Sequence, residues 1–399
     1  MTKLAVFSYK NCWLSDTSPT GYATDGGFPF QMSHLSHRRA ETTLVIPCVP
    51  GAHQVGEVPL TGHRLTVRPL TALSGSGILR KLRFLGWALR NSPTLLSEAW
   101  RADAVHAPVP GDIGTIGMLL AILFRKPLFV RHCGNWLAPV TTAEHFWKWL
   151  MERFAGGQNV MLATGGAAKP PSKSNPNIRW IFATRLSDQE IESCRIKRDL
   201  PSKGRVRLVI ACRQDREKGT GVVIESLPLI LKSFPNATLS VLGDGDALAE
   251  FRSRASELGL TQRIEFHGKV DHQRVLEVLH QSDLFCYPTA ASEGFPKAVL
   301  EALACGLPVI TSRVSVLPNL ISTGCGILLD EVTPTTVAHA VVQALANAET
   351  YCKMSNLAMK TASEYSLERW RDAIADLLHA AWGRHVTVRV RLAQADAKN

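Results

Sequence analysis

Short runs of β-branched and other apolar residues alternate with longer amphipathic segments along most of the chain. In the first half this pattern predicts a helix over 111–126 and strands at 3–9, 42–47, 102–108 and 127–132. In the second half it predicts helices at 221–234 and 272–282, with strands at 205–212, 237–246, 263–268, 282–288 and 307–312. Strands that alternate with helices form βαβ units, so we expect parallel sheets covered on both faces.

A polar, charged stretch over 186–205 interrupts this pattern, and we place a domain boundary in its latter half. A chain of 399 residues is long enough for two domains of ordinary size. The predicted fold class is therefore α/β, with two tandem Rossmann-like, doubly wound domains facing across a cleft. We expect an N-terminal domain over 1–195 and a C-terminal domain over 196–365. The remaining 366–399 would form a helix, ending near residue 382, that returns toward the N-terminal domain, and then a loose tail.

Composition limits the class of protein and partner. Hydrophobic residues make up 45% and charged residues 20%, as in soluble globular proteins, and no apolar run is long enough to span a membrane. The N-terminus matches a first strand rather than a signal peptide. The nine cysteines are scattered and include no C-x-x-C pair, so neither a zinc site nor a disulfide framework is indicated, which favours a reducing cytoplasm.

The net charge of +11 suits nucleic acid, an anionic membrane surface or a phosphorylated substrate. Because the sequence holds no zinc finger, helix-turn-helix or aromatic-basic motif, we do not expect a nucleic-acid partner.

Candidate chemistry lies in the loops that follow the strands of the second half, where open α/β sheets bind ligands. Arg213 and Lys218 stand on a glycine-containing loop that opens a helix. Two cations beside a helix N-terminus suit a diphosphate, although a solvated basic loop explains the pattern equally well.

The stretch "SEGFPKAVLEALACGLP" places two glutamates around a second helix start. Pro296 suits the first helical position, and Gly306 and Pro308 suit the end, so we expect a helix over about 296–305. Glu293 would then lie in the loop, and Glu301 on the second turn among apolar residues. A buried carboxylate needs a donor, which could be a sugar diol or, more ordinarily, a neighbouring Lys or Arg.

These segments together resemble the large family 4 of retaining, nucleotide-sugar-dependent glycosyltransferases with the GT-B fold ("glycosyl transferases group 1"). The resemblance rests on "CRQDREKGTG", "VLGDGD", "IEFHGKV", "DLFCYPTAASEGFPKAVLEALACGLPVITS" and "GCGILL", in the family's order across roughly 205–330. The first half resembles the family only loosely, as acceptor-side domains usually do.

The resemblance implies a role for each matching residue. Arg213 and Lys218 would hold the donor diphosphate, Glu293 would contact the donor sugar, and Glu301 would accept hydrogen bonds from the ribose. Further donor contacts are implied for the main chain of Gly294, Phe295, Pro296, Lys297, Lys269 and Val270. In the first domain, His132 would approach the donor sugar and the loop of Gly26 and Gly27 would lie near the diphosphate and acceptor.

Three departures from the family pattern bear on these roles. Cys212 replaces the usual glycine before Arg213, "RHCGNW" is an uncommon context for the histidine, and the segment before Gly26 is unusually long. The implied activity is transfer of a hexose from a uridine- or guanosine-diphosphate sugar, with retention and without a metal or other cofactor. We expect this activity in the biosynthesis of polysaccharide, lipopolysaccharide or glycolipid for the cell envelope. A nucleotide-sugar 2-epimerase and a non-catalytic binding or scaffold protein are the alternatives.

The segment 77–91, "GILRKLRFLGWALRN", predicts an amphipathic helix. Ile78, Leu82, Leu85 and Leu89 form an aliphatic stripe that we expect to pack on the domain. The other side would then face outward, with Arg80, Arg83, Phe84, Trp87 and Arg90. A basic-aromatic face suits an anionic membrane, although a solvated basic face explains the pattern as well. We therefore expect a cytoplasmic enzyme, and hypothesise a peripheral site at the inner face of the cytoplasmic membrane and a glycan or lipid-linked acceptor.

Overall fold

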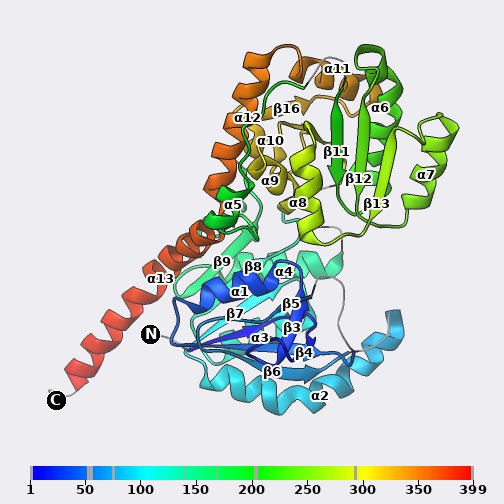
Figure 1. Ribbon diagram of the computed structural model, residues 1–399. Coiled ribbons are helices and arrows are strands. Elements are labelled where there is room, and N and C mark those ends of the chain that lie inside the picture. Colours follow the sequence, from blue (N-terminus) through cyan, green and yellow to red (C-terminus); the bar gives the residue numbers. More distant parts are fainter. Residues whose placement is uncertain are drawn as a thin grey trace. The chain divides into compact units, whose positions relative to one another are not determined.

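The computed structural model describes residues 3–51, 57–73, 77–139, 141–167, 169–201, 205–291 and 294–396; the side chains of 77–82 and 384–396 are not described. The chain divides into two compact units (Figure 1). The first unit holds residues 1–165, 169–185 and 367–399, and the second holds 166–168 and 186–366. The chain passes between the units at residues 185–186, before helix α5 (Asp188–Cys194), whereas the predicted boundary lies after that helix.

The first unit is built on a parallel sheet of seven strands in the order β10-β9-β8-β7-β1-β4-β6. The strands are β1 (Lys3–Phe7), β4 (Glu41–Cys48), β6 (Leu65–Thr71), β7 (Ala104–Val109), β8 (Leu128–His132), β9 (Asn159–Thr164) and β10 (Arg179–Ile181). Their inner residues are buried on both faces, which explains why they appear in the sequence as nearly continuous apolar runs.

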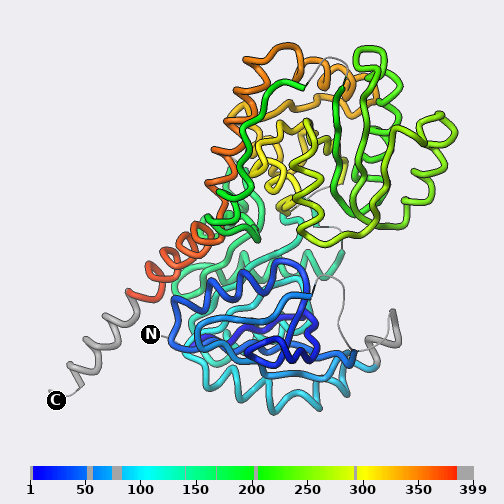
Figure 2. The backbone as a smooth tube through the Cα atoms, viewed as in Figure 1, coloured from blue at the N-terminus to red at the C-terminus, as the bar shows by residue number. Residues whose placement is uncertain are grey.

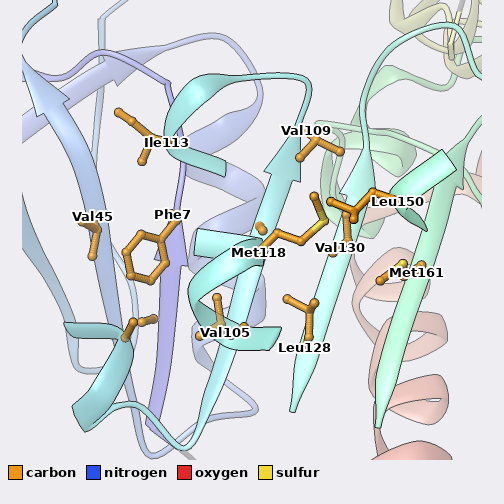
Figure 3. Packing of buried hydrophobic residues seen from close by; sticks show 14 of the residues in the cluster. Phe7, Val45, Val105, Val109, Ile113, Met118, Leu128, Val130, Leu150 and Met161 are labelled. Atoms are coloured by element: carbon orange, nitrogen blue, oxygen red, sulfur yellow. The ribbon is translucent and has the colours of Figure 1, made fainter. Parts of the chain in front are cut away.

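One face of this sheet is covered by α2 (Gly77–Arg101), α3 (Asp112–Leu123) and α4 (Thr142–Phe154). Figure 3 shows the packing, in which Met118 of α3 lies among side chains from neighbouring strands, including Val105, Leu128 and Val130. Each of these four side chains is fully buried, so this face forms a continuous apolar core.

The opposite face is covered by α1 (Phe28–Ser36) and by the last helix, α13 (Leu367–Asp396). Trp370, Ile374, Leu378 and Trp382 recur every fourth residue of α13 and are buried against this face. The prediction of a loose tail after residue 382 is wrong as far as Asp396, because the helix continues there. The sequence beyond Gly383 holds no glycine or proline that would end a helix, and residues 397–399 lie outside the described part.

A small antiparallel sheet combines two strands from the long segment before Gly26 with a third strand that follows β4. It consists of β2 (Trp13–Leu14), β3 (Tyr22–Asp25) and β5 (Glu57–Pro59). Glu57 ties it together, since its carboxylate accepts hydrogen bonds from Trp13 Nε1 (2.9 Å) and Ser15 Oγ (2.7 Å). These strands are too short to be predicted from a periodic pattern.

Helix α2 lies beside β6 (Figures 1 and 2), but Phe84 and Trp87, which were predicted to face outward, pack on the core. Arg83 and Arg90 are exposed, as predicted. Trp87 is 7% exposed, stacks on Phe84, and donates from Nε1 to the Thr71 carbonyl at 2.6 Å. Leu85 and Leu89 are 69% and 68% exposed. The error has a physical reason: the larger aromatic rings bury more apolar area than the leucines, and the indole finds a carbonyl at the strand end. The predicted positions Ile78, Arg80 and Leu82 lie outside the described side chains.

The second unit is a parallel sheet of six strands in the order β13-β12-β11-β14-β15-β16. The strands are β11 (Arg207–Ala211), β12 (Thr238–Leu242), β13 (Ile264–Gly268), β14 (Leu284–Tyr287), β15 (Val309–Ser312) and β16 (Gly326–Leu329). Besides α5, its helices are α6 (Thr220–Ser233), α7 (Leu248–Glu257), α8 (His272–Gln281), α9 (Lys297–Ala304), α10 (Leu317–Ile321), α11 (Pro334–Ala344) and α12 (Ala348–Ala362). Both doubly wound sheets were predicted, and the fold class is confirmed.

Two of the loops at the carboxyl edge of this second sheet meet at Gly243. A Cβ added at Gly243, whose φ is +107°, would lie 1.9 Å from the Cys212 carbonyl oxygen. We expect Gly243→Ala to lower the free energy of unfolding of this unit by about 2–4 kcal/mol, because the clash adds to backbone strain. Urea unfolding measures the change. Gly259→Ala is the matched control: its φ is +69° but nothing lies within 4 Å, so only the strain of about 1–2 kcal/mol should remain. Equal losses in the two variants would contradict this account of Gly243.

Candidate functional site

The strand order of the second unit places a topological switch between β11 and β14. From β11 the chain proceeds outward through β12 and β13, then returns to β14 on the other side of β11. The loops that follow β11 and β14 therefore diverge from adjacent strands at the same edge of the sheet. Open α/β sheets bind ligands at such a point.

The loop after β11 is fixed by Gln214, whose side chain is fully buried. Its Nε2 donates to the carbonyls of Leu242 (2.8 Å) and Cys212 (3.0 Å), and its Oε1 accepts from Thr220 Oγ1 (2.7 Å). The side chain thus binds the loop both to β12 and to the start of α6. No sequence pattern marked Gln214, because an amide between two charged residues looks like an ordinary loop residue.

Arg213 and Lys218, the two predicted cations, stand at either end of this braced loop. The Arg213 side chain is 68% exposed, and its Nε lies 3.1–3.2 Å from the Asp215 carboxylate. Lys218 ends a 3₁₀ turn (Arg216–Lys218), and its N–H donates to the Asp215 carbonyl at 3.0 Å. Both cations are therefore positioned beside the N-terminus of α6, where backbone N–H groups also favour an anion.

The loop after β14 packs directly against this one. The Glu217 carbonyl accepts hydrogen bonds from the N–H groups of Ala290 (2.8 Å) and Ala291 (3.2 Å). Gly219, with φ of +90°, approaches so closely that a Cβ there would lie 2.3 Å from the Pro288 carbonyl oxygen. Glycine is required at this position, because the two loops could not meet around any side chain. The predicted cations and the start of the glutamate-containing stretch are thus brought together.

Glu301 lies on the second turn of α9 and is 7% exposed. Its Oε1 lies 3.2 Å from Nε2 of His272, the first residue of α8. The partner is neither the Lys nor the Arg considered from the sequence but a histidine placed by the Asp271 cap, whose carboxylate accepts from the Arg274 N–H at 2.8 Å. One imidazole leaves acceptor capacity on the Glu301 carboxylate for a further donor.

The segment between Glu293 and Glu301 is described from Gly294 onward; Glu293 itself lies outside the described residues. Phe295 is 8% exposed, and its ring lies 5.5 Å from that of Tyr365. Pro296 caps α9 with φ of −80° and ψ of 98°, so the helix begins at Lys297 and not, as predicted, at the proline. The N-terminus of α9 thus starts one residue later, still directly after the loop that follows β14.

Lys269 and Val270 form the link between β13 and α8, where Lys269 is exposed and Val270 is half-buried. They follow β13, which is separated from β11 by β12, at the same edge of the sheet. Their main chain lies just before the cap of α8, whose first residue contacts Glu301.

The remaining predicted residues belong to the first unit. His132 ends β8, is 2% exposed and packs edge-on against Trp136, with ring centroids 5.3 Å apart. Its buried Nδ1 makes no hydrogen bond within the part of the chain that the structure describes. Burial lowers the pKa of His132 to about 4, so the ring is neutral at physiological pH.

The burial of His132 predicts a pH dependence of stability. An unfolded histidine has a pKa near 6.5, so between pH 6.5 and 4 the unfolded chain binds more protons than the folded one, and stability falls as the pH drops. We expect His132→Asn to reduce this loss by about 2–3 kcal/mol over that range, measured by urea unfolding at a series of pH values. His145→Asn, at an exposed position of α4, is the control. Parallel curves for wild type and His132→Asn would contradict a neutral, buried His132.

Gly26 and Gly27 lie between β3 and α1, as predicted. Gly26 has a φ of +70° and Gly27 caps the helix, so the pair forms the turn into α1. Asp25, just before the pair, is ion-paired with Lys10 from the loop after β1. The ion pair thus joins the end of β3 to the loop after β1.

A pocket that was not predicted opens at the carboxyl edge of the first sheet. It has a volume of about 210 Å³ and is lined by Tyr9, Asn11, Pro47, Leu73, Trp87, Asp112 and Ile113. Tyr9 and Asn11 follow β1, Pro47 lies in β4, and Leu73 follows β6. Trp87 belongs to α2, and Asp112 and Ile113 to the first turn of α3. The lining residues are dispersed along the chain, so only the topology of the sheet could bring them together.

Comparison with known proteins gives a family match within the second unit. Residues 193–361 match the family model described as "Glycosyl transferases group 1". We refer to residues 193–361, which are under half of the chain, as the group 1 domain. The group 1 domain includes Arg213, Lys218, His272 and Glu301, and so contains every part of the site in the second unit.

Two curated relatives are similar over part of the chain. A phosphatidyl-myo-inositol mannosyltransferase of Mycobacterium leprae is 29% identical over 37% of this chain and 39% of its own length. A glycogen synthase of Mycobacterium tuberculosis is 29% identical over 37% of this chain and 32% of its own length. The chain thus matches well under half the length of these relatives.

Among solved structures, the Anabaena protein Alr3699/HepE in complex with UDP and glucose superimposes with a TM-score of 0.69. The match covers 95% of this chain and all of that one, at 17% identity. The similarity therefore extends beyond the group 1 domain to the first unit, and confirms the GT-B fold for the chain as a whole.

Proposed function

We propose that this chain is a glycosyltransferase that moves a hexose from a nucleoside-diphosphate sugar to a glycan or lipid-linked acceptor, with retention of configuration. The observation that carries the proposal is the meeting of two loops in the group 1 domain. One loop bears Arg213 and Lys218, and the other leads into the helix that bears Glu301. Sequence and topology thus independently indicate the same edge of the sheet.

In this proposal the donor diphosphate binds at the loop after β11. As the bond between the sugar and the diphosphate breaks, negative charge grows on the leaving phosphate oxygens. Arg213, Lys218 and the N–H groups at the starts of α6 and α9 stabilise that charge. Gln214 and Gly219 fix the backbone of the loop that carries the two cations, so little reorganisation of this backbone is needed during the reaction.

Glu301 accepts hydrogen bonds from the two ribose hydroxyls, while His272 holds the carboxylate in place. The main chain at Lys269 and Val270 contacts the base. Glu293, Gly294, Phe295, Pro296 and Lys297 contact the sugar and phosphate, as the family resemblance implies. His132, neutral because of its burial, is proposed to approach the donor sugar without adding positive charge to it.

The nucleotide specificity of the site can be measured by calorimetric titration with UDP, GDP and the corresponding hexose conjugates. One nucleoside diphosphate is expected to bind with a dissociation constant in the micromolar range, and Gln214→Ala should weaken it by releasing the loop. Absence of binding by every nucleotide in a folded protein would overturn the proposed donor site.

The pocket at the edge of the first sheet is our candidate for the acceptor. Tyr9, Asn11 and Asp112 place hydroxyl, amide and carboxylate groups there beside the apolar surfaces of Leu73 and Trp87. This mixture suits a sugar ring, whose polar edge accepts and donates hydrogen bonds and whose faces pack on apolar groups. Trp87 also belongs to α2, so the acceptor candidate adjoins the helix with the exposed leucines.

Helix α2 is the proposed contact with a membrane surface, although by a different face from the one predicted. Leu85, Leu89, Leu96 and Trp100 are spaced by four, seven and four residues, so they form one exposed apolar stripe. Trp100 is 66% exposed and lies under the Lys126 ammonium, 5.8 Å from the ring centroid. Exposed Arg83, Arg90 and Arg101 share the helix. No helix in the described part of the chain is long and apolar enough to cross a membrane.

The double variant Leu85→Asp/Leu89→Asp tests this surface. We expect its affinity for vesicles containing phosphatidylinositol to fall about 10- to 100-fold, because two apolar anchors are replaced by charges that anionic lipid repels. Co-sedimentation with the vesicles measures the change. Leu14→Asp is the matched control, since Leu14 is also a leucine of this unit and is equally exposed at 69%. Unchanged binding of the double variant would remove α2 from the proposed membrane surface.

A further inference from the structure

Two cysteines and a histidine that are distant in the sequence meet where α5, α8 and α9 end. Cys194 is the last residue of α5, His280 lies near the end of α8, and Cys305 caps the end of α9. One ligand atom from each lies within 4.8 Å of the other two. The spacing of the cysteines in the sequence indicated no metal site, because only the packing of three helices brings the residues together.

The two cysteines of the cluster are buried, and its histidine is held by a hydrogen bond. Cys194 and Cys305 are 2% and 0% exposed, whereas His280 is only half-buried and leaves an approach from solvent. His280 Nε2 lies 3.0 Å from the Cys194 carbonyl oxygen, which fixes the ring. Such a bond to a backbone carbonyl is the usual support of a metal-binding imidazole when the other nitrogen is the ligand.

A buried arginine and the ends of three helices lie beside the cluster. The buried Arg198 guanidinium donates to the carbonyls of Cys305 (2.7 Å) and Leu279 (3.0 Å) next to the cluster. The C-terminal ends of three helices also meet here, and their dipoles favour a cation.

We propose that Cys194, His280 and Cys305 bind one thiophilic d¹⁰ cation, Zn²⁺ or Cu⁺. Two sulfur ligands and one imidazole are the donor set of both ions. In a tetrahedral zinc site, bonds of about 2.0–2.3 Å hold the ligand atoms roughly 3.3–3.8 Å apart, so the cluster needs to contract by only about 1 Å. Three protein ligands leave a fourth position on Zn²⁺ for water, whereas Cu⁺ is satisfied by three.

The bound ion would join α5 to α8 and α9, the two helices that carry His272 and Glu301. Glu301 is one turn before Cys305 on α9, and the Cys305 N–H donates to the Glu301 carbonyl at 3.1 Å. His272, the partner of Glu301, is on the same helix as His280. Binding would therefore stabilise the two helices that hold the carboxylate, without a bond from the ion to a donor-site residue.

The test is metal analysis and direct titration of the full chain under reducing conditions. Apo-protein titrated with zinc sulfate, or with Cu⁺ under a competing chelator, is expected to bind one equivalent of one of these ions. Zinc at about 100 times its dissociation constant should raise the thermal midpoint by about 5–10 °C. Substitution with Co²⁺ should give the visible absorption of a thiolate complex. These readouts need no transferase activity, so they are independent of the proposed function.

Cys194→Ser and His280→Gln should each lower the affinity at least 10-fold, whereas Cys352→Ser should bind like wild type. Cys352 is a matched control because it lies close by, its Sγ 3.4 Å from the Arg198 carbonyl oxygen, but outside the cluster. Failure of the folded wild type to bind either ion would overturn the proposal. So would a disulfide between Cys194 and Cys305 in protein purified without reductant, shown by seven free thiols in place of nine under denaturing conditions.

Discussion

Lys218→Met is expected to lower kcat for sugar transfer about 10²- to 10³-fold, the usual cost of removing one fixed group that stabilises charge in a transition state. The loss should exceed the loss in nucleotide affinity, because the charge on the leaving diphosphate grows as the bond breaks. Methionine keeps the length of the side chain and removes only the ammonium group. Steady-state kinetics with varied donor concentration separates the two effects.

Arg216→Met is the matched control for Lys218→Met. Arg216 lies in the same 3₁₀ turn, but its side chain is 78% exposed and its Nε pairs with Glu250 at 2.8 Å. Substitution there changes the net charge of the loop by the same amount and should leave kcat within about twofold, as exposed ion pairs contribute little. Equal losses in the two variants would mean that the overall charge of the loop, and not the position of Lys218, controls the rate.

Glu301→Gln is expected to weaken binding of the nucleoside diphosphate about 10- to 100-fold, because charge-assisted hydrogen bonds to the ribose become neutral ones. A 2′-deoxynucleotide identifies the cause. Wild type should bind the deoxy ligand more weakly than the ribonucleotide, whereas Glu301→Gln should discriminate much less between them. Calorimetry of the four combinations gives the coupling between the carboxylate and the hydroxyl directly.

Glu225→Gln controls for loss of a carboxylate elsewhere in the group 1 domain. Glu225 is exposed on α6 and pairs with Arg254 at 3.0 Å. Its substitution should change neither affinity nor discrimination. If Glu301→Gln retained the full preference for the ribonucleotide, Glu301 would be a structural partner of His272 rather than a ribose ligand.

Much of the fold could be predicted because parallel strands buried on both faces appear as apolar runs. The strands that begin near Lys3, Ala104, Arg207 and Leu284 were all recognised in this way. The two-residue strand at Trp13–Leu14 is too short to form such a run, and the other two strands of its small antiparallel sheet are also short. The length of α13 was underestimated for a different reason. Residues from Trp370 to Trp382 in its first half pack on the first sheet, and nothing in the sequence marks where the continuation ends.

The loops of the candidate site could be predicted from the sequence because their backbone geometry requires glycine. The partners of its side chains could not, because they depend on how the helices pack. A Cβ at Gly219 or Gly243 would clash with the neighbouring loop. Glycine is therefore needed at both positions, and the loops around Arg213 and Lys218 can be recognised in the sequence. By contrast, His272 pairs with Glu301 only because α8 and α9 pack together. The inward face of α2 was mispredicted for the same reason, since periodicity shows two faces but not which of them the sheet buries.

The central claim is that the group 1 domain uses its donor for transfer and does not merely bind it. The most direct test is the rate at which wild type and Glu293→Ala release labelled hexose from UDP- and GDP-sugars, by hydrolysis or by transfer to an added acceptor. Our account predicts that one donor is consumed by the wild type, that the product keeps the anomeric configuration of the donor, and that Glu293→Ala is at least 10²-fold slower. Equal rates in the two proteins, or binding of the nucleotide sugar without transfer, would contradict it.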